Sequence, residues 1–203
     1  MRQIPLPLGK GAGPSRIVVG KANQAVIDAF AHIADWPFRT AVVFGPPRSG
    51  KSLVGRWFVQ SGHGACIDDA EQLDEDELFH RWNRNQEAGG NLLIIANAGE
   101  GGWSIRLPDL ASRIGAALHL EVGEPDDAML ADLIAVHAEM LGLSLGPDAA
   151  AYLVPRAERS HLGIERLVTA IDRLSLERKQ APTMAIWRDA LDETFGASQP
   201  RLL

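Results

Sequence analysis

The sequence predicts an α/β fold in which helices cover a parallel β-sheet, followed by a region built only from helices. Up to residue 122, short apolar runs rich in β-branched residues alternate with helical patterns, which indicates successive strand–helix–strand units. From residue 126 onward the helical periodicity continues and no further strand is predicted. These two observations predict one α/β domain and a second, helical domain.

Four apolar runs are predicted as strands of the sheet: residues 40–44, 65–67, 91–96 and 117–122. Because residues 40–44 form an apolar, β-branched run, we expect this strand to be buried on both faces, as in a parallel sheet, and the strand at residues 65–67 is also expected to be buried. Helices are predicted before and between the strands, at residues 23–34, 53–60, 74–87 and 107–116. In the C-terminal region, glycine and proline separate four further predicted helices, at residues 126–141, 147–158, 162–179 and 183–195.

The domain limits follow from changes in composition along the chain. Residues 1–16 are expected to form a flexible tail, because glycine and proline interrupt regular structure there. The α/β domain is expected to span residues 17–123 and the helical domain residues 124–203.

Composition restricts the classes of partner. The chain has 203 residues, and its 20 lysines and arginines against 26 aspartates and glutamates give a net charge of −6. An acidic chain is not suited to coating itself with DNA phosphate, so a protein partner is expected. The N-terminus lacks a secretory signal pattern, and no apolar run approaches the roughly 18 residues of a membrane span. The single cysteine, Cys66, is expected in the core, and a cytoplasmic location is expected.

The most specific motif is a phosphate-binding loop between the first strand of the sheet and the next helix. Residues 45–52 match the pattern G-x-x-x-x-G-K-[ST] in full. The glycines let backbone N–H groups surround a phosphate, Lys51 neutralises its charge, and the Ser52 hydroxyl can bind Mg²⁺. The residues expected to contact ADP or ATP are Gly45, Pro46, Pro47, Arg48, Ser49, Gly50, Lys51, Ser52 and Leu53.

Polar side chains follow the next two strands. Asp68 and Asp69 directly follow residues 65–67, and Asn97 follows the strand at residues 91–96. In P-loop proteins the first acid holds Mg²⁺ and the second acts on the attacking water, so Asp68 is predicted with Ser52 as a metal ligand and Asp69 as a catalytic residue. Asn97 is predicted to sense the terminal phosphate. The alternatives are a solvated strand end for the acids and a turn-forming asparagine.

Taken together, the motifs resemble the core of DnaA. The similarity rests on residues 17–23, the phosphate loop, Asp68 with Asp69, and the segment Leu-Ala-Ser-Arg-Ile at residues 110–114. The resemblance implies an AAA+ P-loop NTPase core followed by a small all-helical lid domain. It also implies that Val19 lines the adenine pocket and that Arg113 acts as an arginine finger on a neighbouring subunit's nucleotide. The alternative for Arg113 is an ordinary surface cation.

Within that group the chain resembles the Hda family, DnaA-related regulators of replication initiation. It ends after the helical region, without the helix-turn-helix domain of DnaA, so no sequence-specific DNA binding is expected. The N-terminal residues Gln3, Ile4, Leu6 and Leu8 are similar to the sliding-clamp-binding peptide of that family. The resemblance implies binding to the β subunit of DNA polymerase III and stimulation of DnaA-bound ATP hydrolysis. The alternative for the peptide is a tail that contains some aliphatic residues.

One family feature is missing. Leu162 or Gly163 stands where the family's second sensor arginine is expected, and Arg166 follows about a turn later, which leaves efficient hydrolysis by the chain itself open. Two other functions therefore remain: a stand-alone AAA+ ATPase, such as a helicase loader, and an adaptor that holds nucleotide only as a structural ligand. Whether copies of the chain assemble with one another is also left open.

Overall fold

The structure is a computed structural model that describes residues 2–5, 16–97 and 103–196, with backbone only for residues 2–5. The chain divides into two compact units. One contains residues 21–123 and carries the parallel sheet, and the other contains residues 16–20 and the helices from residue 124 onward. The change of unit at residues 123 and 124 falls where the composition of the sequence changes. Residues 17–20 belong to the helical unit, whereas the sequence analysis placed them in the α/β domain.

The main sheet contains four parallel strands in the order β4-β5-β3-β6. Their bounds are β3 Thr40–Gly45, β4 Ala65–Ile67, β5 Leu92–Asn97 and β6 Leu118–Glu121. The residues of β3 and β5 are almost all buried, as expected for apolar runs at the centre of a parallel sheet. Because parallel strands end at the same edge, this order brings the segments after β3, β4 and β5 together.

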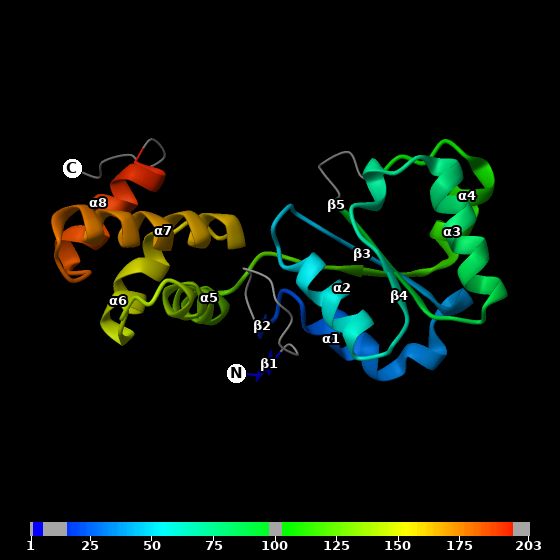
Figure 1. Cartoon of the computed structure of the whole chain (residues 1–203), viewed down its shortest axis with the longest axis horizontal. Helices are drawn as coiled ribbons and strands as arrows, with labels where there is room; N and C mark the ends of the chain where they lie inside the picture. Colours follow the sequence, from blue (N-terminus) through cyan, green and yellow to red (C-terminus); the bar gives the residue numbers. More distant parts are fainter. Residues whose placement is uncertain (1, 6–15, 98–102, 197–203) are drawn as a thin grey trace. The chain divides into compact units, whose positions relative to one another are not determined.

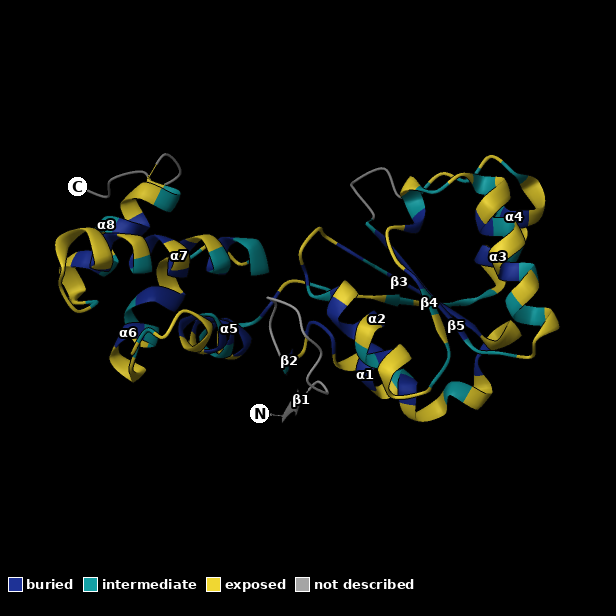
Figure 2. Cartoon of the chain, in the orientation of Figure 1, coloured by how far each residue is buried: buried dark blue, intermediate teal, exposed yellow. Residues whose placement is uncertain are grey.

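Helices cover both faces of the sheet (Figure 1), and Figure 2 shows that the helices are banded with buried and exposed residues. The helices of this unit are α1 Gln24–Ala29, α2 Lys51–Gln60, α3 Glu75–Glu87 and α4 Pro108–Ala116. Helices α3 and α4 enclose one core cluster with the strands, in which Leu78, Trp82 and Leu110 pack near Val42 and Ile94. Helix α2 lies on the opposite face and approaches so closely that a Cβ at Gly55 would lie 2.7 Å from both Cys66 Sγ and Ile95 Cδ1. A side chain at position 55 would therefore require these two side chains, or the helix, to shift.

The other unit combines a small two-stranded sheet with four helices. The sheet pairs β1 Arg2–Pro5 with β2 Arg16–Val19, and the helices are α5 Asp127–Met140, α6 Pro147–Leu153, α7 His161–Arg178 and α8 Met184–Phe195. Helix α5 packs on both β2 and α7, and α7 packs on α8. The helical character predicted after residue 126 is confirmed.

Two predicted helices are shorter in the structure. The first helix ends at Ala29 and continues as a 3₁₀ segment, Phe30–Asp35, before Pro37. The helix predicted for residues 147–158 ends at Leu153, and Val154–Arg156 forms a 3₁₀ turn around Pro155, whose missing N–H cannot continue the helix. None of the helices in the described ranges is both long and apolar enough to cross a membrane.

Candidate functional site

The predicted phosphate loop lies between β3 and α2, at the carboxyl end of the sheet. Gly45 and Gly50 both have positive φ, 155° and 88°. A Cβ at Gly45 would lie 2.8 Å from the carbonyl oxygen of Val122 on the neighbouring strand's continuation, so the loop requires glycine there. The first backbone N–H groups of α2, which begins at Lys51, have no carbonyl partner within the helix. The local conformation therefore suits an anion at this loop.

Lys51 is folded back into the loop. Its side chain is 3% exposed, and Nζ donates hydrogen bonds to the carbonyl oxygens of Gly45 (2.9 Å) and Pro46 (2.6 Å). A longer bond of 3.3 Å reaches Ser49 Oγ. All three acceptors are oxygens of the loop itself, and a bound phosphate offers the same kind of acceptor with more negative charge. The amine is therefore placed where it can exchange loop oxygens for phosphate oxygens.

The acids predicted at the end of β4 lie in the electrostatic surroundings of this lysine. Burial lowers the pKa of Lys51 below its ordinary value, and the negative charges of Asp68, Glu71 and Asp69 oppose that shift. Both aspartates are exposed, and Asp68 Oδ1 accepts a hydrogen bond from the backbone N–H of Asp69 at 3.0 Å. The structure thus brings Lys51, Asp68 and Asp69 to one edge of the sheet.

Asn97, at the end of β5, joins this group through its side chain. Its Nδ2 donates to Asp69 Oδ1 at 3.0 Å and to Glu71 Oε1 at 2.8 Å, and its backbone N–H donates to Glu71 Oε2 at 3.1 Å. Asp69 has φ 49° and ψ 42°, which turns the chain sharply into the 3₁₀ segment Ala70–Gln72. This turn brings Glu71 back over the end of β5.

Glu71 was not identified as a site residue by the sequence analysis. Burial acts to raise the pKa of Glu71, but the hydrogen bonds from Asn97 outweigh it, so the pKa lies below its ordinary value. The side chain therefore remains ionised and binds both the backbone and the side chain of Asn97. No pattern in the sequence marks this role, because it depends on the left-handed conformation of Asp69.

The predicted magnesium ligands are Ser52, which is exposed in the first turn of α2, and Asp68. Within the described residues, no group of three or more histidine, cysteine or acidic side chains is arranged to hold a metal ion. A hydroxyl and a carboxylate nevertheless fit Mg²⁺, which commonly takes one or two protein oxygens and completes its shell with phosphate and water.

Arg113 lies apart from this edge, in the last turn of α4. Its guanidinium carbon is 4.6 Å from the ring centroid of Phe79 and 4.4 Å from that of Trp82, both on α3. Its Nη1 also donates a hydrogen bond to Asn83 Oδ1. The residue as a whole is half-buried.

Other predicted residues lie in the helical unit or at the N-terminus. Val19 is buried in β2, which packs on α5. Of the expected clamp-binding residues, Gln3 and Ile4 lie in β1, while Leu6 and Leu8 lie outside the described residues.

The lid position that sequence analysis compared with a sensor arginine is tightly packed. A Cβ at Gly163 would lie 2.8 Å from Glu158 Cβ and 3.0 Å from Ser160 Oγ, so a longer side chain there would require a shift. Arg166, one turn further along α7, is exposed.

The phosphate loop and the acids and amide beside it lie at the carboxyl end of a parallel α/β sheet, and several solved structures share this fold. Domain III of the replication initiation protein DnaA from Thermotoga maritima matches with a TM-score of 0.74 and 16% identity, over 93% of this chain and 98% of that one. The Thermotoga maritima RuvB Holliday junction branch migration motor matches with a TM-score of 0.62 and 15% identity, over 86% of this chain and 70% of that one. AMPPCP-bound DnaA from Aquifex aeolicus matches with a TM-score of 0.61 and 16% identity, over 80% and 66%. The chain therefore has the AAA+ fold, as the sequence predicted.

One relative is also similar in sequence over part of the chain. The chain is 26% identical over 133 residues to an uncharacterised protein of Haemophilus influenzae, and the match covers 63% of this chain and 58% of that protein. The chain thus spans little more than half the length of this relative. No family model matches the sequence.

Proposed function

We propose that the chain binds ADP or ATP with Mg²⁺ at the carboxyl end of its sheet. The observation that carries this proposal is the buried Lys51, whose amine donates hydrogen bonds to three oxygens of a loop with the full phosphate-binding sequence. Phosphate oxygens would replace these acceptors, and Ser52 with Asp68 would hold the Mg²⁺ that neutralises the remaining charge. The binding of AMPPCP by DnaA from Aquifex aeolicus, which has the same fold, supports nucleotide binding by this chain.

In the proposed site Asp69 orients or activates the attacking water, and Asn97 contacts the terminal phosphate. The hydrogen bond between Asn97 Nδ2 and Asp69 Oδ1 links the two side chains, and the Glu71 carboxylate restrains the asparagine from the other side. A carboxylate that accepts a hydrogen bond from a fixed amide is oriented for work on a nearby water. Bound Mg²⁺ would supply charge neutralisation at the phosphates.

We further propose an Hda-like role in the control of replication initiation. Here the segment Gln3–Leu8 docks on the β sliding clamp, and Arg113 is presented to ATP held by DnaA, whose hydrolysis it stimulates. The similarity to DnaA domain III supports a partner of the same fold, because AAA+ arginine fingers act across interfaces between such domains. The extended backbone of β1 suits a peptide that lies along a groove.

The test measures hydrolysis of DnaA-bound ATP on clamp-loaded DNA with wild type, Gln3→Ala and Arg113→Ala. The proposal expects stimulation by wild type and loss of stimulation with either variant. Clamp binding should be lost with Gln3→Ala and retained with Arg113→Ala, while both variants should bind nucleotide normally. Absence of stimulation by wild type would exclude the regulatory role. Full stimulation by Arg113→Ala would instead indicate an adaptor.

The linked Asp69 and Asn97 side chains favour a second candidate function, a stand-alone ATPase, because they form the kind of pair that hydrolysis requires. This alternative predicts ATP turnover without DnaA or the clamp. It also predicts that Asp69→Asn abolishes turnover while Gln3→Ala leaves turnover unchanged. A turnover rate equal in wild type and Asp69→Asn would exclude it.

A further inference from the structure

The strand β4 is an open edge of the main sheet. It pairs only with β5 among the described strands, at the end of the order β4-β5-β3-β6. The N–H of Ala65 donates to the carbonyl of Asn91 beside β5, at 2.9 Å. Because alternate residues of a strand direct their N–H and C=O groups to opposite sides, those of Cys66 point away from the sheet. The N–H and C=O of Cys66 therefore offer a partner strand one hydrogen-bond donor and one acceptor at this edge.

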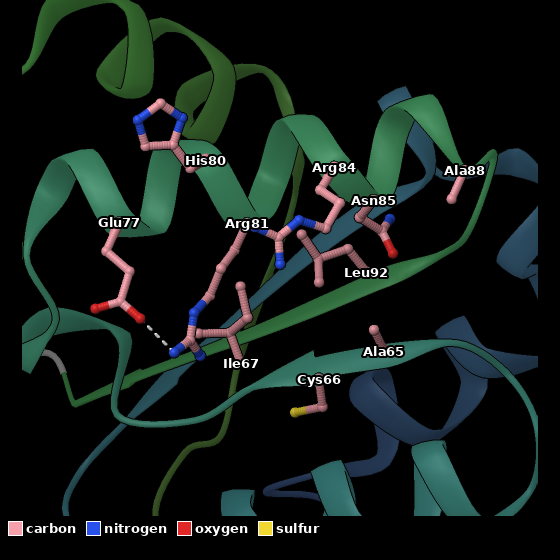
Figure 3. A pocket seen from close by; sticks show the side chains of 10 residues that line it. All are labelled: Ala65, Cys66, Ile67, Glu77, His80, Arg81, Arg84, Asn85, Ala88 and Leu92. Atoms are coloured by element: carbon pink, nitrogen blue, oxygen red, sulfur yellow. Dashed lines mark hydrogen bonds and ion pairs between the residues drawn. The ribbon is translucent and has the colours of Figure 1, made fainter.

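Beside this edge lies a groove of about 920 Å³, with β4 as one wall and α3 as the other. Figure 3 shows its strand side, which includes Ala65 and Cys66, and the side chains of Arg81 and Arg84 leaving α3 toward the strands. Ligand pockets commonly measure about 300–1,000 Å³, so this volume admits several residues of an extended chain. Burial raises the pKa of the Cys66 thiol to about 12, so the thiol stays protonated and is a poor nucleophile.

The charge of the groove is opposite to that of the whole chain. Two arginines, Arg81 and Arg84, and one acid, Glu77, line it, in a protein whose net charge is −6. Arg81 forms an ion pair with Glu77, whereas no ion pair of Arg84 occurs within the ranges that the structure describes. One exposed positive charge is therefore left facing the groove, and a carboxylate would complement it.

We propose that this groove binds an extended acidic segment of a partner protein, which adds to the sheet as a strand beside β4 and places a carboxylate against Arg84. The segment pairs its backbone with Cys66, and its alternate side chains point toward α3. Binding here is independent of the nucleotide function proposed above, because the groove uses none of the residues assigned to that function.

Two other occupants fit less well. A sugar–phosphate backbone would satisfy Arg84 but does not supply the alternating donors and acceptors of a strand. A second copy pairing edge to edge would bring two arginine-lined walls and two acidic chains together, which charge repulsion opposes. The peptide strand satisfies both the open backbone and the charge.

The test uses the intact protein and two synthetic probes, the blocked peptides Thr-Glu-Val-Glu-Val-Glu-Thr and Thr-Lys-Val-Lys-Val-Lys-Thr. The two peptides share strand propensity and differ in charge. Binding is followed by nuclear magnetic resonance titration of the amide signals, with the exchange rate of the Cys66 amide hydrogen as the site-specific readout. The acidic peptide is expected to bind saturably and slow that exchange, whereas the basic peptide is expected not to bind.

Two pairs of variants locate the effect. Cys66→Pro removes the outward N–H without removing a hydrogen bond to β5, and Cys66→Ala keeps that N–H while removing the thiol. We expect no acidic-peptide binding with Cys66→Pro and wild-type binding with Cys66→Ala. Arg84→Glu should weaken binding about fivefold to tenfold. Arg188→Glu, the same charge change at an exposed residue of α8, should leave it unchanged.

Each other outcome overturns the proposal. Absence of saturable binding by the acidic peptide, or equal binding of both peptides, would exclude an acidic strand as the occupant. Nucleotide binding and circular dichroism show whether Cys66→Pro folds. If it does not fold, the comparison of Arg84→Glu with Arg188→Glu still tests the proposal. Equal affinities of these two variants for the acidic peptide would overturn it. Self-association of wild type that Arg84→Glu strengthens or abolishes would identify a second copy as the occupant instead.

Discussion

Two cationic side chains, Lys51 and Arg113, are held by their own chain in different ways. Lys51 is bound by backbone and hydroxyl oxygens from positions two to six residues away in its own loop. Arg113 is bound by side chains of α3, and its hydrogen-bond partner Asn83 lies 30 positions earlier in the sequence. The first setting is a local loop geometry, and the second is a tertiary contact between two helices.

This difference indicates what each cation is ready to bind. The oxygens around Lys51 are the chemical equivalents of phosphate oxygens, so a nucleotide can replace them without rearranging the fold. Arg113 instead packs on the rings of Phe79 and Trp82, so the position of its guanidinium depends on how α3 and α4 pack. A partner would meet an arginine whose position depends on α3.

Replacing Lys51 should produce the largest effect. We expect Lys51→Ala to weaken ADP and ATP binding about 100-fold, because truncating a buried charged hydrogen-bonding partner costs about 2–5 kcal/mol. Arg113→Ala should leave the affinity unchanged, which would separate the two cations in function. The measurement is calorimetric titration with each nucleotide. Arg188→Ala, which removes one positive charge from an exposed position on α8, is the control, and a loss below threefold for Lys51→Ala would exclude phosphate contact by this lysine.

Removing the charge of Glu71 should have an intermediate effect on stability. Glu71→Gln keeps one acceptor for Asn97 but loses the second, and we expect a decrease of about 1 kcal/mol in the free energy of unfolding at pH 7. Because the folded-state pKa of Glu71 is depressed, its contribution is present above the unfolded pKa and disappears as the pH falls through the folded one. The difference from wild type should therefore narrow below about pH 4.3.

Urea denaturation across this pH range checks both parts of the prediction. Glu87→Gln, at an exposed position of α3, is the control and should change stability little at any pH. A Glu71→Gln variant as stable as wild type at pH 7 would mean that the carboxylate does not hold Asn97 in solution.

The sequence predicted the phosphate loop and the strand ends of this site because those features depend on short-range patterns. The loop pattern predicted that Lys51 lies between a strand and a helix, and the apolar runs before Asp68 and Asn97 predicted that each follows a strand of the sheet. Glu71 was missed because its position depends on the positive φ of Asp69. The setting of Arg113 was missed for a different reason: a guanidinium between α3 and α4 depends on how two helices pack, which periodicity does not encode.

The smallest expected effect tests the setting of Arg113 directly. In a double-mutant cycle with Phe79→Leu and Arg113→Ala, we expect a coupling of about 0.5–1 kcal/mol in the free energy of unfolding, the usual strength of a half-exposed cation–π contact. Leucine keeps the apolar packing of position 79 on the core cluster, so the cycle isolates the ring. The control cycle combines Arg113→Ala with Ala111→Gly. Residue 111 lies on the same helix, and its substitution involves no ring contact. A coupling near zero for Phe79 would mean that the guanidinium leaves the rings in solution. Arg113 would then be positioned by a partner and not by α3. In that case Lys51 would belong to a preformed site, whereas the site of Arg113 would form only on binding.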